Sequence, residues 1–250
     1  MAITAATPTP VWLNYFRQEE SLKDQYVDVG IAEEHAVALA SGIASQGGKP
    51  VLSILSSFAQ RTYDQWSQDL AINNNPALIM VSWAGITGGD VTHLGIFDIP
   101  LISNIPNIVY LAPTSKEECL AMIEWGIEQK NHPVAIRVPN GNVISTGVKI
   151  EPNFDNLNVY QKTIDGSEVA IIGLGSFYDL GRRVQEKLQS ETGIKATLIN
   201  PRFITGIDKQ MLTELLDNHK LVITLEDGVL DGGFGEKISR FESVKFRMKK

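Results

Sequence analysis

Cysteine is nearly absent from this chain, and long apolar runs are missing. Among 250 residues there is one cysteine, Cys119, which excludes an internal disulfide framework and a cysteine-rich zinc module. The four histidines and the acidic residues show no spacing typical of a metal site, so we predict no metal ligands. No stretch reaches the ~18 apolar residues of a membrane span, and the first residues do not resemble a signal peptide. We therefore expect a cytoplasmic protein with no membrane partner.

Positively charged residues are also fewer than negatively charged ones. Lys and Arg total 22 against 29 Asp and Glu, which gives a formal net charge of −7. Nucleic acids and anionic membranes are bound through a positively charged face that releases counterions, so we expect no nucleic-acid partner. The apolar share of 43% and the charged share of 20% are instead typical of a globular protein with a sizeable core.

What the sequence does contain is an alternation of short apolar runs with amphipathic stretches. Runs such as ALIMVSW, at 77–83, are apolar throughout, which favours parallel strands covered on both faces. The alternation predicts β-α-β units and an α/β fold with a mostly parallel sheet between helices. The predicted strands are Met1–Ala5, Val51–Leu55, Ala77–Ser82, Ile108–Leu111 and Val134–Val138, and the predicted helices are 33–46, 58–72 and 115–129.

The texture changes at 139–166, where Pro, Gly and Asn recur without a helical period. A second block of strands and helices follows, from EVAIIGLG to the stretch after Gly232-Gly233. We therefore predict a first domain at 1–145, a linker at 146–166 and a second α/β domain, expected to be incomplete, at 167–250. Short edge strands are an alternative within the linker segment. Since the chain starts directly with a strand, we expect part of a longer polypeptide or one subunit of a split enzyme.

The densest group of candidate site residues is YVDVGIAEEHAVALASGIA, at 26–44. A strand is predicted to end at Val29-Gly30, which places Glu33 and Glu34 in the first turn of the next helix. Both carboxylates could simply stabilise that helix end through its dipole. However, the residues after His35 are small and apolar on all faces, so the helix is expected to be buried. A buried carboxyl at a strand's carboxyl end could bind a ligand and hold or pass a proton.

This segment resembles the pyrimidine-binding domain of the thiamine-diphosphate enzymes of the transketolase family, on the side of the 1-deoxy-D-xylulose-5-phosphate synthases. The matching motifs occur in order: AITAAT, DVGIAEEHAVALASGIA, SSFAQRTYDQ, AGITGGDVTHLGIFD, IPNIVYLAPTSKEE and PVAIRVPNG, then IIGLG, LINPRFI and TLEDG. The resemblance implies two three-layer α/β domains: the thiamine-diphosphate pyrimidine-binding fold and a transketolase C-terminal-like domain. It also implies an enzyme that transfers a two-carbon or acyl unit from a sugar or keto acid onto an aldehyde.

The resemblance implies roles for three residues. Glu33 aligns with the glutamate that hydrogen-bonds the cofactor's aminopyrimidine ring and thereby helps remove the thiazolium proton. Phe58 aligns with the aromatic side chain that stacks on the pyrimidine, although by itself it would fit a helix core with Trp66 and Leu70. Arg61, a candidate cofactor-binding residue, matches a stretch at the edge of the cofactor site and the dimer interface, and a surface ion pair is the alternative.

A glycine-containing loop carries the second predicted catalytic residue. WAGITGGDVTHLGIFD, at 83–98, has glycines that permit unusual backbone conformations, and loops on a rigid sheet commonly carry function. A lone loop histidine is more often solvated than catalytic. His93, however, aligns with an active-site histidine that handles protons of the substrate. Asp90, three residues earlier, is a candidate substrate-binding residue.

Two positions depart from the synthase pattern. Trp83 and Asn140 stand where the resemblance leads us to expect arginines that bind the phosphate of glyceraldehyde 3-phosphate. Losing two charge-assisted contacts weakens phosphate binding, so an unphosphorylated sugar is an alternative substrate. Arg137 remains as a candidate anchor for one substrate anion.

The implied cofactors are thiamine diphosphate and Mg²⁺. In this family a GDG…N motif holds the magnesium and the diphosphate, and this chain contains no such motif. A diphosphate-binding domain, in cis or as a partner subunit, is therefore expected to hold the Mg²⁺. Because the family's site forms between two chains, a homodimer is also expected.

Two alternatives stay open. One is the beta subunit of an oxo-acid dehydrogenase, although THLGIFD fits the transketolase side better. The other is a non-catalytic scaffold subunit that has lost the phosphate-binding residues, against which the joint retention of Glu33, Phe58 and His93 argues. The turn GLGSF, at 173–177, is a weak nucleotide-binding signal, and we interpret the second domain as structural and dimer-forming.

Overall fold

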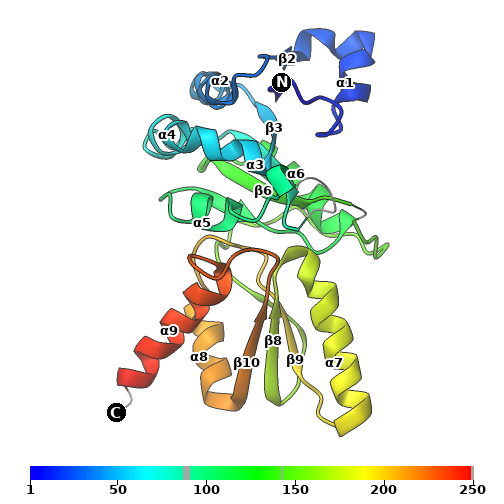
Figure 1. The fold of residues 1–250 in the computed structure, drawn as a ribbon, viewed down its shortest axis with the longest axis vertical. Coiled ribbons are helices and arrows are strands. Elements are labelled where there is room, and N and C mark those ends of the chain that lie inside the picture. The colour runs from blue at the N-terminus through cyan, green and yellow to red at the C-terminus, as the bar shows by residue number, and fades with distance from the viewer. Residues whose placement is uncertain (87–90, 142, 249–250) are drawn as a thin grey trace.

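A computed structural model describes residues 1–86, 91–141 and 143–248 of the chain. Two sheets, each with helices packed on it, lie end to end along the molecule (Figure 1). The elements up to the end of the first sheet are β1 (Ala2–Thr4), α1 (Asn14–Gln18), β2 (Tyr26–Asp28), α2 (Glu33–Ser45), β3 (Val51–Leu55), α3 (Ser56–Ala59), α4 (Tyr63–Gln65), the π-helix η3 (Trp66–Ala71), β4 (Leu78–Ala84), the 3₁₀ turn η4 (Val91–His93), α5 (Asp98–Ser103), β5 (Val109–Leu111), α6 (Lys116–Glu128) and β6 (Val134–Pro139). The later elements are β7 (Gln161–Ile164), β8 (Glu168–Gly173), α7 (Tyr178–Thr192), β9 (Thr197–Asn200), α8 (Lys209–Asn218), β10 (His219–Leu225) and α9 (Phe234–Met248).

The first sheet confirms the predicted parallel α/β architecture. Its strands lie in the order β2-β1-β3-β4-β6-β5, and every pair is parallel. Residues of the apolar run in β4 alternate between the two faces of the sheet. Ile79 and Val81 pack in the cluster formed with α2 and α5, whereas Leu78 packs in the cluster formed with α6. The run is apolar throughout because both faces are covered.

The second sheet is smaller and has one antiparallel edge. Its order is β10-β8-β9-β7, where β7 pairs antiparallel with β9 and the other pairs are parallel. The helix α7 covers one face, and α8 and α9 cover the other (Figure 1). The strand β7 lies inside the segment predicted as a linker. Its residues alternate between exposed and half-buried, as suits a short edge strand, which explains why no apolar run marked it.

One continuous hydrophobic cluster joins the two sheets. It includes Tyr110 of β5 and Ala112 just after that strand, and Ala170 and Ile172 of β8. A Cβ placed on Gly175 would lie 3.2 Å from the Cβ of Ala112, so the turn after β8 packs directly on the first part of the chain. The carboxyl ends of β8 and β10 therefore face the first sheet.

The short helix α5 is not among the predicted helices. It begins at Asp98, the last residue of the predicted glycine-containing loop, and Pro100 lies in its first turn, where a missing N–H is tolerated. Its buried residues Ile99 and Ile102 belong to the common core. This helix carries the end of the His93 loop directly into packed structure.

Candidate active site at the carboxyl edge of the first sheet

Three of the predicted site residues follow three strands of the first sheet. Glu33 comes after β2, Phe58 after β3 and His93 after β4. Because these strands are parallel, their carboxyl ends meet at one edge of the sheet, where α/β proteins place ligands. The structure thus places at one sheet edge residues that are up to 60 positions apart in sequence, from 33 to 93.

Glu33 is the first residue of α2 and is only 3% exposed. The chain reaches it through Gly30, whose φ of +73° is a conformation that favours glycine. The helix behind it is held in the core by Ala36, Val37 and Ala40, each 0% exposed. The small apolar residues of the segment therefore explain how a carboxylate comes to lie at a buried helix end. The burial agrees with the sequence analysis, and the catalytic role of Glu33 stays a prediction.

Arg61 spans both glutamates of the first helical turn. Its Nη1 lies 3.2 Å from Oε2 of Glu33, and its Nε lies 3.4 Å from Oε1 of Glu34. The arginine side chain is 54% exposed, so these contacts contribute on the order of 1 kcal/mol or less to stability. Of the two interpretations of Arg61, the ion pair is what the structure displays. It is formed with Glu33 itself, at the edge of the candidate site.

Phe58 and His93 are in ring contact. Their centroids are 5.5 Å apart with an interplanar angle of 62°, an edge-to-face arrangement worth about 0.5–1.5 kcal/mol beyond burial. The Nδ1 of His93 lies 2.8 Å from the hydroxyl of Thr92, which leaves Nε2 as the nitrogen directed away from that contact. The imidazole is thus oriented by two neighbours. Phe58 also packs against the hydrophobic core. Its position therefore fits both the predicted packing in the helix core and the predicted place in the site.

Ser56 is a residue that the sequence analysis missed. It is the first residue of α3, directly after β3, and is 1% exposed, and within the described part of the chain nothing hydrogen-bonds its Oγ. A buried hydroxyl without a partner costs about 1–3 kcal/mol. The signal that could have identified it is a small polar residue at the end of an apolar strand, two positions before Phe58.

The loop that carries His93 is closed at its base by two glycines. Gly85 and Gly95 form an antiparallel bridge, with N···O distances of 2.6 and 3.2 Å. Gly85 has a φ of +88°, and a Cβ on Gly95 would lie 2.2 Å from the carbonyl oxygen of Trp83. Glycine is therefore required at both positions. Asp90, predicted to bind substrate, lies outside the described residues.

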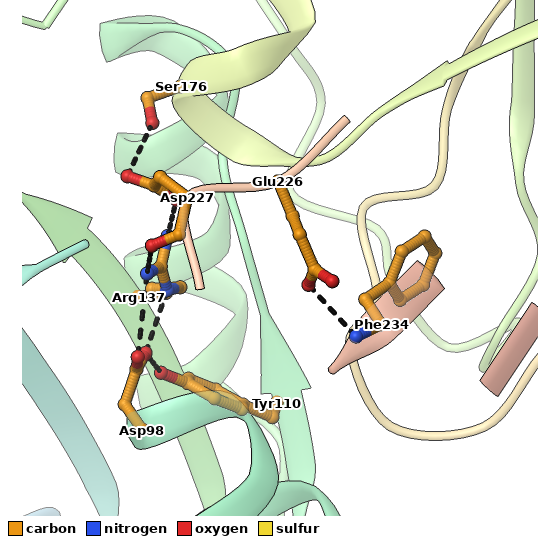
Figure 2. Close-up of polar contacts among 7 residues, drawn as sticks. All are labelled: Asp98, Tyr110, Arg137, Ser176, Glu226, Asp227 and Phe234. Carbon is orange, nitrogen blue, oxygen red and sulfur yellow. Dashed lines mark hydrogen bonds and ion pairs between the residues drawn. The ribbon is translucent and has the colours of Figure 1, made fainter. Parts of the chain in front are cut away.

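Arg137 does not have the environment predicted for a substrate anchor. It is 3% exposed, and its guanidinium lies between two buried carboxylates, those of Asp98 and Asp227 (Figure 2). Burial alone would lower the pKa of Arg137, but the two carboxylates outweigh burial and hold that pKa above its usual range. The geometry argues against a role in binding substrate anions. Both partners are far away in the sequence, which is why the pairing could not be predicted.

The two positions that depart from the synthase pattern, Trp83 and Asn140, bring no charge to this edge of the sheet. Trp83 has a φ of +58°, rare for a bulky residue, and its indole Nε1 donates to the carbonyl of Pro10 over 3.1 Å. Asn140 lies just after β6. Neither side chain carries a charge to this edge.

Other potential reactive groups are few. The described residues contain no cluster of three or more His, Cys, Asp or Glu that could hold a metal ion. Burial, followed by the charge of Glu118, raises the pKa of Cys119 to about 11, so its thiol is a poor nucleophile at neutral pH. None of the described helices combines the length and the apolar character needed to cross a bilayer.

Comparison with known sequences matches both halves of the chain to transketolase family models. Residues 1–145 match the family model "Transketolase, pyrimidine binding domain", and residues 160–246 match "Transketolase, C-terminal domain". The 1-deoxy-D-xylulose-5-phosphate synthase of Halothermothrix orenii is 41% identical over 244 residues, covering 96% of this chain and 37% of the relative. That of Trichormus variabilis is 41% identical over 243 residues, with 96% and 38% covered. The chain thus spans somewhat more than a third of the length of these curated relatives.

Comparison with solved structures agrees about the fold. The structure of a split-gene transketolase, an inactive beta4 tetramer, superposes with a TM-score of 0.81 at 22% identity, covering 98% of this chain and 79% of that one. A transketolase from Pichia stipitis superposes with a TM-score of 0.76 at 17% identity, covering 92% and 36%. On the family models and the curated relatives, this chain belongs to the transketolase family, of which it contains the pyrimidine-binding and C-terminal domains.

Proposed function

We propose that this chain provides the pyrimidine-binding half of a thiamine-diphosphate-dependent transferase. The complete enzyme would move a two-carbon or acyl unit from a sugar or keto acid onto an aldehyde. The observation that carries the proposal is the buried carboxyl group of Glu33, on the same sheet edge as the Phe58–His93 ring pair. The curated relatives named as 1-deoxy-D-xylulose-5-phosphate synthases support the same reaction class.

The residues present fit the aminopyrimidine end of the cofactor. Such a ring needs an apolar surface to stack on and hydrogen-bond partners for its nitrogens. Phe58 offers the aromatic surface, and Glu33 offers a carboxyl group shielded from water. The buried Oγ of Ser56, without a partner among the described residues, is a further hydrogen-bonding group at this edge. We propose that these three side chains bind the ring.

Each side chain then has a defined task. When bound, the cofactor supplies a carbon nucleophile for the carbonyl group of the donor substrate. With the ring bound, the carboxyl of Glu33 hydrogen-bonds a ring nitrogen and passes a proton to and from it, while Arg61 keeps that carboxyl oriented through the 3.2 Å contact. His93, oriented by Phe58 and by the hydroxyl of Thr92, gives or takes the proton of a substrate oxygen through Nε2.

The diphosphate half of the cofactor needs groups other than these. Because the described residues hold no metal-binding cluster, we propose that Mg²⁺ is bound by a separate diphosphate-binding domain, in cis or on a partner subunit. The structural neighbour named as a split-gene transketolase supports the second arrangement, since that protein is divided between genes. We also propose a homodimer, since the outward side of α2 presents the small or apolar residues Ala38, Leu39 and Ile43.

Phosphate recognition is proposed to be weak. Neither Trp83 nor Asn140 offers a positive charge, and Arg137 is enclosed by carboxylates. We therefore expect the complete enzyme to prefer glyceraldehyde 3-phosphate over glyceraldehyde by less than about 100-fold in kcat/KM, a difference of about 2.7 kcal/mol. A larger preference would contradict this part of the proposal.

Reconstitution tests the main proposal. The chain is mixed with the diphosphate-binding domain of its own protein, Mg²⁺ and thiamine diphosphate, and cofactor binding is followed by quenching of protein fluorescence. Exchange of the thiazolium proton with deuterium is then measured by NMR. The proposal predicts saturable quenching and accelerated exchange, both of which require this chain. Binding without faster exchange would instead support the scaffold alternative, and no binding at all would refute the proposal.

A further inference from the structure

A buried charge cluster joins the second sheet to the base of the His93 loop. Its members are Arg137 of β6, Asp98 at the start of α5, Tyr110 of β5, and Asp227 just after β10 (Figure 2). The Nε of Arg137 lies 2.7 Å from Asp98, its Nη1 contacts Asp227, and the hydroxyl of Tyr110 donates to Asp98. The side chains of Arg137 and Asp98 are 2% and 0% exposed.

The cluster places two carboxylates beside one guanidinium. Arg137 and Asp98 already form a balanced pair, with a second contact of 3.4 Å from Nη2 to Oδ1. Asp227 adds a second carboxylate beside one guanidinium, and its side chain is only 7% exposed. Burying an extra charge is costly, and such groups are weak evidence for stability. A specific task for Asp227 would account for its presence.

The position of Asp227 indicates that task. Its Oδ2 faces Gly85: a Cβ built on Gly85 would lie 1.9 Å from that oxygen. Gly85 in turn bridges to Gly95, two residues after His93. Asp98, three residues after Gly95, is held by the same guanidinium that holds Asp227. Both ends of the His93 loop therefore lie against one cluster. Asp227, just after β10 of the second sheet, is part of that cluster.

The residue next to Asp227 has a different task. Glu226 accepts hydrogen bonds from the backbone N–H groups of Phe234 and Gly235, at 2.8 and 3.1 Å, and so caps α9. Figure 2 shows the two consecutive carboxylates directed to different partners. Glu226 binds the helix that follows the second sheet, whereas Asp227 contacts Arg137 of the first sheet and also accepts a hydrogen bond from Ser176, in the turn after β8, over 3.4 Å. The pair provides a matched comparison of an internal contact with a contact to the loop.

We propose that Asp227 is a positioning residue that holds the His93 loop, through Gly85 and Arg137, so that the imidazole stays against Phe58. The catalytic consequence of this positioning rests on the proposed function. The positioning itself concerns only this chain. The second sheet would thus set the geometry of a site to which it contributes no touching residue.

The test uses NMR on this chain, selectively labelled with ¹³C in the rings of histidine and phenylalanine. The readout is the ring-to-ring nuclear Overhauser effect (NOE) between Phe58 and His93, with His93 assigned from the variant His93→Gln. Asp227→Ala is expected to weaken this NOE at least threefold and to shift the His93 ring signals. Asp227→Asn, which keeps the side chain's shape, is expected to retain most of the NOE. Glu226→Gln, the matched control, is expected to leave it unchanged.

The outcomes separate positioning from simple stabilisation. If Asp227→Ala lowers the melting temperature but leaves the NOE and the His93 shifts as in the original chain, the proposal is overturned. If Asp227→Ala does not fold, Asp227→Ser takes its place with the same readout. A change of equal size in Glu226→Gln would also overturn it, because the effect would not be specific to the loop.

In the reconstituted enzyme, Asp227→Ala should lower kcat about 10- to 100-fold, since displacement of a reacting group by about 1 Å costs that much. The KM for substrate and the affinity for thiamine diphosphate should stay within about twofold, because Asp227 touches neither. Equal losses in KM and kcat would contradict the positioning role. If the unsubstituted enzyme shows no thiamine-dependent activity, the proposed function fails, and the NMR result still decides the positioning.

Discussion

The two sheets end differently at the edge where α/β proteins place ligands. At the first edge, the hydroxyl of Ser56 has no partner among the described residues, and Glu33 contacts the half-exposed Arg61. At the second edge, Glu226 is bound by the start of α9, and Asp227 is bound by Arg137. The same topology thus gives an open first edge, where a buried hydroxyl lacks a partner among the described residues, and a closed second edge, where the protein's own groups bind the carboxylates.

The glycine turn of the second sheet shows why topology alone does not make a site. A Cβ on Gly173 would lie 2.6 Å from the Cα of Tyr178, and Gly175 has a φ of +54° beside Ala112. These glycines are needed for close packing and for the turn itself. The resemblance of GLGSF to a nucleotide-binding turn therefore has a steric explanation. This supports a structural role for the second domain, while its part in dimer formation stays a prediction.

The largest expected effect on the free energy of unfolding comes from removing the arginine that binds the carboxylates at the closed edge. Arg137→Met removes the one guanidinium between Asp98 and Asp227 and leaves two carboxylates buried without a cation. Breaking a buried ion pair from one side costs about 3–5 kcal/mol of the free energy of unfolding. Urea unfolding followed by circular dichroism measures this cost.

Arg182→Met is the matched control for that variant. Arg182 also pairs with two carboxylates, those of Asp179 and Glu186, but its side chain is 44% exposed. Exposed pairs contribute about 0–1 kcal/mol, so a small loss is expected. If Arg137→Met were no more destabilising than Arg182→Met, the second edge would not be closed by its charges in the way described.

The next effect tests the open edge, where turnover should suffer and stability should not. Glu33→Gln removes the proton-holding group but keeps its shape, so kcat of the complete enzyme should fall about 10²- to 10⁴-fold. The affinity for thiamine diphosphate, measured by calorimetry, should change only a few-fold. Glu34→Gln is the control, because Glu34 shares the contact with Arg61 but is more exposed. Equal losses of turnover and affinity in Glu33→Gln would contradict the catalytic role.

The difference between the edges also marks what a sequence can predict. The first edge was predictable, because Glu33 sits at a recognisable strand-to-helix junction and the ordered motifs carry the family resemblance. Strands such as β3 and β4 were predictable from apolar runs. The closed edge was not, since Arg137 pairs with residues 39 and 90 positions away, which no local pattern links. Short edge strands were expected in the linker, but the bounds of β7 could not be predicted, because an exposed edge strand needs few apolar residues.

A pH effect should appear at the second edge. Burial, and then the charge of Arg240, lowers the pKa of Lys237 in α9 from 10.5 to about 8, against the opposing charge of Glu226. Between about pH 8 and 10.5 the unfolded chain therefore binds more protons than the folded one, and the stability rises with pH. Relative to Lys237→Met, the chain should gain on the order of 1–3 kcal/mol of unfolding free energy over this window.

Lys220 provides the opposite sign for comparison. A hydrogen bond from Lys220 to Glu168, followed by the charge of that glutamate, raises the pKa of Lys220, so its small contribution to stability is present below that pKa and is lost as the pH rises through it. Urea unfolding of the variants Lys237→Met and Lys220→Met from pH 7 to 11 separates the two. A stability difference between the original chain and Lys237→Met that does not change with pH would show that the amino group of Lys237 is not desolvated in the fold.

The smallest effect distinguishes the two edges most directly. Ser56→Ala removes a buried hydroxyl that has no partner in the described part of the chain, so the unfolding free energy should rise by about 1 kcal/mol. Ser41→Ala is the control, because that hydroxyl donates to the carbonyl of Asp69 over 2.7 Å and accepts from Asn75. Its loss should cost about 1–2 kcal/mol. If Ser56→Ala cost as much as Ser41→Ala, Ser56 would have a protein partner in solution, and its proposed role at the open edge would fall. If it costs nothing while weakening the affinity for thiamine diphosphate, the hydroxyl is kept for the ligand, because its removal leaves the fold intact.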